Sequence, residues 1–151
     1  MEDNWRSKTL ENLVKREFGD PMEAPTNMVK RCLELCRTPL SEFTVEDIRL
    51  MIAQGFSLEY LVPLASEHLI ENIFAEGDYY PGDLLANVLK IDQEFWRNNR
   101  PAWKEIADSY SICYNAFTGA SPKWSPSDTC YNFITFVRPP GRCLFHIFPY
   151  I

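Results

Sequence analysis

The chain has no long apolar segment. None of its 151 residues lies in a run of 18 apolar residues, and the N-terminal MEDNWRSKTLENL is charged and lacks the apolar region of a signal peptide. We therefore expect a cytoplasmic protein that does not associate with membranes.

Positive charge is also scarce. Lys and Arg number 15 against 21 Asp and Glu, which gives a net charge of −6 and a pI near 4.9. Proteins that bind nucleic acid need Lys and Arg to displace counterions from phosphate. The composition therefore argues against a nucleic-acid partner and favours a basic protein.

The sequence lacks the motifs of common catalytic sites. It has no P-loop, no G-x-G-x-x-G, no H-E-x-x-H and no G-x-S-x-G, and its two histidines, His68 and His146, stand alone. Asp78 and Asp83 lie five residues apart across a proline and do not match a calcium-binding loop. We expect no enzyme, no catalytic residue and no cofactor.

Cysteine usage indicates thiols rather than disulfides. The chain has an odd number of cysteines, five in all: Cys32, Cys36, Cys113, Cys130, Cys143. A cytoplasmic protein keeps its cysteines reduced. Cys32 and Cys36 share one helix face and could supply two metal ligands, but no second Cys or His pair follows. We predict no metal site and two half-buried thiols in the core.

Charge divides the chain into two regions. Residues 110–151 carry one acid and three bases, so residues 1–109 hold 20 of the 21 acids and 12 of the 15 bases. Within residues 38–89 nine acids stand against a single base, Arg49. This concentration of negative charge either belongs to the solvated surface of helices or steers the protein toward a basic partner protein. We expect a domain over residues 1–109 and a C-terminal extension over residues 110–151.

The first region has the pattern of an all-α fold, a compact bundle of five or six short helices. Residues that suit helix starts precede stretches with apolar residues at helical spacing: Thr9, Asn27, Thr44, Ser57, Pro81, Asp92. The clearest start is FTVED, where Thr44 and Asp47 predict a capping box and Phe43 and Ile48 a hydrophobic staple. Gly55 should end that helix. Pro63 should lie in the first turn of the next helix or kink it.

The extension is aromatic, with ten of the 21 aromatic residues at or after Tyr110. The runs CYNFITFV and CLFHIF flank RPPGR and predict a β-hairpin. Three interpretations remain open: a segment that recognises a partner, a β element that covers the helices, or sequence that was never selected as protein. Its apolar surface could support a weak dimer in place of a monomer.

The stretch GDYYPGDLL, residues 77–85, combines structural and exposed residue types. Gly77 and Gly82 permit tight turns, Pro81 suits the first position of a helix, and the two leucines supply its buried face. Two acids and two tyrosines remain for a functional role.

Together, TLENL, PLSEFTVEDIRLMIAQG, LEYLVPLASEHL, EGDYYPGDLL and DQEFW resemble one family of contact-dependent growth inhibition (CDI) immunity proteins, from about Lys8 to Trp96. The resemblance implies a cytoplasmic protein that binds the C-terminal toxin domain of an exported effector, often a nuclease, and blocks it. Candidate toxin-binding residues are the acids and tyrosines of residues 59–83: Glu59, Glu67, Glu71, Asp78, Tyr79, Tyr80, Asp83. The alternative is a small acidic regulatory or adaptor module that binds another basic protein.

Overall fold

The computed structural model describes residues 4–118, and these residues are mostly helical. Three short 3-10 helices accompany seven α-helices: α1 (Leu10–Val14), α2 (Asn27–Cys36), α3 (Val45–Ala53), α4 (Leu58–Glu71), α5 (Asp83–Val88), α6 (Gln93–Asn98), α7 (Arg100–Thr118). The predicted helical fold is confirmed for this part of the chain, which has seven α-helices where five or six were expected. The predicted β-hairpin lies outside the described residues.

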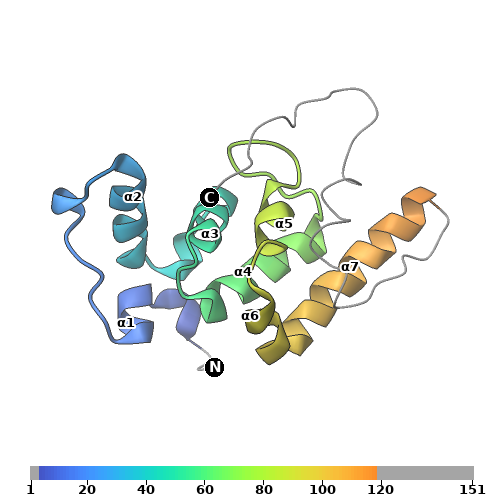
Figure 1. Cartoon of the computed structure of the whole chain (residues 1–151), viewed down its shortest axis with the longest axis horizontal. Coiled ribbons are helices and arrows are strands. Elements are labelled where there is room, and N and C mark those ends of the chain that lie inside the picture. Colours follow the sequence, from blue (N-terminus) through green and yellow to red (C-terminus); the bar gives the residue numbers. More distant parts are fainter. Residues whose placement is uncertain (1–3, 119–151) are drawn as a thin grey trace.

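The three helices α3, α4 and α5 pack on one another at the centre of the molecule. In Figure 1, α1 and α2 lie at one end and α7 lies at the other, against α4. One hydrophobic core runs through these elements, from Trp5 near the N-terminus to Ile106 in α7. None of the helices in residues 4–118 is long and apolar enough to cross a membrane.

Both ends of α3 are fixed by short-range hydrogen bonds that the sequence predicts. The Thr44 hydroxyl accepts from the Asp47 amide at 3.2 Å, and the Asp47 carboxylate accepts from the Thr44 amide at 3.0 Å, which confirms the capping box. At the other end Gly55 has a φ of +70°. Its amide donates to Ile52, and the amide of Phe56 donates to Met51, as in a Schellman motif.

Helix α4 begins after Ser57, the predicted N-cap residue, and contains Pro63. Ser57 lies at the N-cap with a φ of +35°, and its side chain makes no capping hydrogen bond. Pro63 lies beyond the first turn, inside the helix, where it withholds the amide that would bond to the carbonyl of Glu59. Ile70, in the last turn of α4, is half exposed.

Two other predicted helix starts are wrong by one or two residues. Thr26, not Asn27, caps α2, and its hydroxyl accepts from Val29 at 3.2 Å. Pro81 is not the first residue of α5, because Gly82 follows as the N-cap with a φ of +87°. Thr9 and Asp92 cap α1 and α6 as predicted.

Helix α7 crosses the position at which the charge of the sequence changes. Ile106 is buried, and Trp103 and Tyr110 pack partly on the core. These three residues share one face of a helix by their spacing. The predicted boundary between residues 109 and 110 places Tyr110 in a different region from Trp103 and Ile106. The helical spacing of the three residues was therefore not recognised in the sequence.

The two N-caps of α3 and α4 give a matched pair of substitutions. Thr44→Ala should lower the free energy of unfolding by about 1 kcal/mol, because it removes a capping acceptor. Ser57→Ala should change it by less than about 0.5 kcal/mol, because no capping bond is lost. Urea unfolding measures both, and equal losses would contradict the difference between the two caps.

Candidate functional site: the GDYYPGD loop

The GDYYPGD loop (residues 77–83) leads from the segment after α4 into α5 (Figure 1). Asp83, the first residue of α5, is buried with 1% of its surface exposed. Its carboxylate accepts hydrogen bonds from the amides of Gly77 at 2.7 Å and Tyr79 at 3.2 Å. Asp83, the last residue of the loop, therefore binds the backbone at the beginning of the loop.

A second carboxylate ties the loop to α3. Oε2 of Glu46 accepts from the amide of Asp78 at 2.9 Å. The same carboxylate receives two hydrogen bonds from Arg49, each 2.6 Å long, in the bidentate arrangement that guanidinium groups favour. Glu46 thus joins α3 to a loop residue that lies 32 positions later in the chain.

Arg49 lies at the centre of this arrangement. It is 8% exposed, and its Nε lies 3.8 Å from Oδ2 of Asp83 as well as 2.6 Å from Glu46. We call Glu46, Arg49 and Asp83 the arginine cluster. A buried guanidinium needs such partners, because removing a charge from water is costly.

The charges of the arginine cluster reinforce one another. The hydrogen bonds from Arg49 lower the pKa of Glu46, against the opposing effect of burial. The hydrogen bonds to Glu46 raise the pKa of Arg49. Both groups are therefore charged at neutral pH, and the loop is held by an ion pair rather than by neutral groups.

Tyr79 is both exposed and fixed. The guanidinium carbon of Arg49 lies 4.5 Å from the centre of its ring, within the range of a cation–π contact, yet 71% of the residue is exposed. The neighbouring Tyr80 is half buried, and burial followed by the charge of Asp83 raises the pKa of its hydroxyl. Tyr79 is therefore the exposed tyrosine of the loop, and Tyr80 is partly buried.

The two glycines of the loop have different roles. Gly82 adopts a positive φ, as the turn prediction requires. Gly77 has no positive φ, but a Cβ there would lie 2.4 Å from Oε2 of Glu46 and 3.0 Å from Oδ2 of Asp83. Glycine at position 77 thus lets the backbone approach two carboxylates closely.

The structure brings together only part of the predicted binding set. Glu71, Asp78 and the two tyrosines belong to the last turn of α4 and the loop that follows. Glu59 lies in the first turn of α4, 12 residues before Glu71, or about 18 Å along the helix.

Two further members of the set are engaged within the protein. Glu67 is exposed and forms an ion pair with Arg6. Asp83 is buried in the arginine cluster, so its carboxylate is not displayed to a partner. The contacts of Glu46 and Arg49 with the loop could not be predicted from the sequence, because folding alone brings α3 to the loop.

The two described cysteines lie deep in the core. Cys32 and Cys36 on α2 are free thiols with 3% and 0% exposure, more buried than the half-buried thiols predicted. Burial raises the pKa of both, that of Cys36 to about 12. Within residues 4–118 no three His, Cys, Asp or Glu side chains are grouped to hold a metal ion.

Gly77→Ala should destabilise the protein by roughly 1–3 kcal/mol, because the new methyl group must displace Glu46 from the loop. Glu46→Ala removes the nearest obstacle, so the same glycine substitution should cost less in that background. Urea unfolding of the two single variants and the double variant measures the coupling. Additive costs would contradict the close approach.

The buried thiols should resist alkylation. In the folded protein near neutral pH, the tryptic peptide CLELCR (residues 32–37) should carry little iodoacetamide label, because thiolate is the reactive form and is strongly disfavoured there. In guanidinium chloride the peptide should label fully. Rapid labelling of this peptide in the folded protein would contradict the burial of α2.

The GDYYPGD loop lies within the part of the chain that matches a known protein family. A family model described as CDI immunity proteins matches residues 12–106, a range that contains helices α2 to α6 and the GDYYPGD loop. No curated protein and no solved structure matches the chain. The match covers well over half of the 151 residues, and it agrees with the resemblance read from the sequence. The chain therefore belongs to the family of CDI immunity proteins.

Proposed function

We propose that this protein neutralises the C-terminal toxin domain of its cognate CDI effector by binding it in a one-to-one complex. The observation that carries the proposal is the family match over residues 12–106, which includes most of the helical core. Inhibition requires no chemistry from the protein. A bound partner that covers the active site, or a face beside it, excludes the toxin's substrate.

We propose further that the toxin is a nuclease. A nuclease must present Lys and Arg to phosphate, and an inhibitor with a net charge of −6 is attracted to that surface. Attraction over a distance mainly raises the association rate, which suits an antidote that must capture its toxin quickly. Protection also needs nearly complete occupancy, hence a Kd of nanomolar order, or about −12 kcal/mol.

The contact residues follow from exposure. We propose Tyr79 as the central anchor, with Tyr80 beside it and Glu71 and Asp78 as charged contacts. Glu59 and Glu67 are exposed and add to the field that attracts the toxin. Asp83 supports the site from inside, because its carboxylate holds two loop amides.

Co-expression with the toxin domain encoded immediately upstream tests the proposal. The protein should restore growth and co-purify with that domain at one to one, whereas a toxin domain from an unrelated effector should escape inhibition. In a titration of purified toxin, activity should disappear at one equivalent.

Two results would contradict the proposal. Failure to rescue growth and to co-purify would exclude immunity toward that toxin. Inactivation by far less than one equivalent would show that the protein acts as a catalyst rather than as a binding partner.

A further inference from the structure

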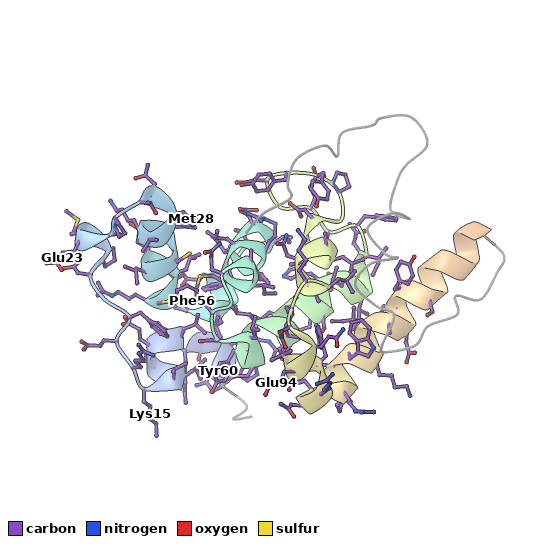
Figure 2. The ribbon with its side chains drawn as sticks, viewed as in Figure 1. Lys15, Glu23, Met28, Phe56, Tyr60 and Glu94 are labelled. Carbon is purple, nitrogen blue, oxygen red and sulfur yellow. The ribbon has the colours of Figure 1, made fainter. Side chains whose placement is uncertain are left out.

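Large apolar side chains are exposed in two groups of the described residues, one of which includes Met28 at the α1 and α2 end (Figure 2). Val14, Met22 and Met28 belong to the α1 and α2 end. Ile70, Phe74 and Tyr79 belong to the last turn of α4 and the segment that follows, with 50%, 42% and 71% of each residue exposed. Such groupings on a soluble protein mark candidate interaction sites.

The charges around the two groups differ. Near the first group the sequence supplies bases as well as acids, including Lys15, Arg16 and Lys30. Residues 50–89 contain no Lys or Arg at all, and the exposed acids Glu71, Glu76 and Asp78 lie next to the second group in the chain. Arg49, the base that contacts the loop, is buried and paired. Exposed acids therefore flank the second group in the chain, and we call these three acids its acidic rim.

The backbone beneath the second group is held in place. The carbonyl of Phe74 accepts from the amide of Gly82 at 3.1 Å, and the amide of Phe74 donates to Asn72 at 3.0 Å. The ring of Phe74 lies within 3.8 Å of the place where a Cβ on Gly82 would be, and that of Tyr79 lies on Arg49. Side chains that are ordered before binding lose less entropy when a partner arrives.

We infer that this surface, formed by Ile70, Glu71, Phe74, Glu76, Asp78 and Tyr79, is the centre of the toxin interface. The inference rests on the proposed function and adds the chemistry of the partner. The facing surface of the toxin domain presents an apolar or aromatic side chain flanked by Lys or Arg. The acidic rim repels phosphate, so the partner is the toxin protein and not its nucleic-acid substrate.

The assignment differs from the set predicted from the sequence. It adds Ile70, Phe74 and Glu76. It leaves out Glu59, which lies at the opposite end of α4, and Glu67, which pairs with Arg6. Tyr80 and Asp83 are the more buried members of the predicted set and lie beside or beneath this surface. An interface of this kind obtains most of its affinity from a few central apolar anchors, while rim charges set the association rate.

Binding of the purified toxin domain to full-length variants tests the inference. Ile70→Ala and Tyr79→Ala should each weaken binding roughly 10- to 100-fold, mainly through faster dissociation. Glu76→Lys should slow association more than Glu76→Gln, and added salt should shrink that difference. Met22→Ala and Glu23→Lys, both at exposed residues of the α1 and α2 end, are the matched controls and should bind within about threefold of the unaltered protein.

Thermal unfolding confirms that each variant is folded before its binding is compared. If the unaltered protein does not bind the toxin domain, the proposed function itself is wrong. If it binds and the variants at Ile70 and Tyr79 bind equally well, the toxin interface lies elsewhere and only this inference is wrong. A larger loss from Met22→Ala or Glu23→Lys than from the variants at Ile70 and Tyr79 would place the interface at the α1 and α2 end and would overturn this inference.

Discussion

The buried guanidinium of Arg49 is the constraint on which the site depends. It comes from α3, pairs with Glu46 of the same helix, lies 3.8 Å from the first residue of α5, and supports the ring of Tyr79. Glu46 and Asp83 in turn hold the three amides at the start of the loop. Removing Arg49 would leave the buried carboxylate of Asp83 without its basic partner, which costs more than an exposed ion pair is worth. The position of the loop is therefore coupled to the packing of the helical core.

Within the GDYYPGD loop, the buried groups and the exposed groups therefore have different roles. The inward groups, Gly77 and the carboxylate of Asp83, fix the backbone, and the outward groups, Asp78 and Tyr79, face solvent. A loop that is ordered before it meets a partner suits an inhibitor that must bind tightly and quickly.

The sequence predicted those features that depend on neighbouring residues. The capping box of Thr44 and Asp47, the glycine after α3 and the caps of α1 and α6 all depend on residues within about five positions. The family resemblance also came from contiguous stretches. The sequence could not reveal that Gly77 approaches Glu46, because those residues meet only when α3 packs on α5. For the same reason Asp83 was expected at the surface, and the side chains of α7 were divided between two regions.

A structure of the complex with the toxin domain tests the central claim most directly. The account predicts that the ring of Tyr79 keeps its contact with Arg49 and that its exposed fraction, 71% in the free protein, falls close to zero against the toxin. Ile70 and Phe74 should be covered in the same interface. A complex in which the toxin domain binds elsewhere, with Tyr79 as exposed as before, would contradict the account.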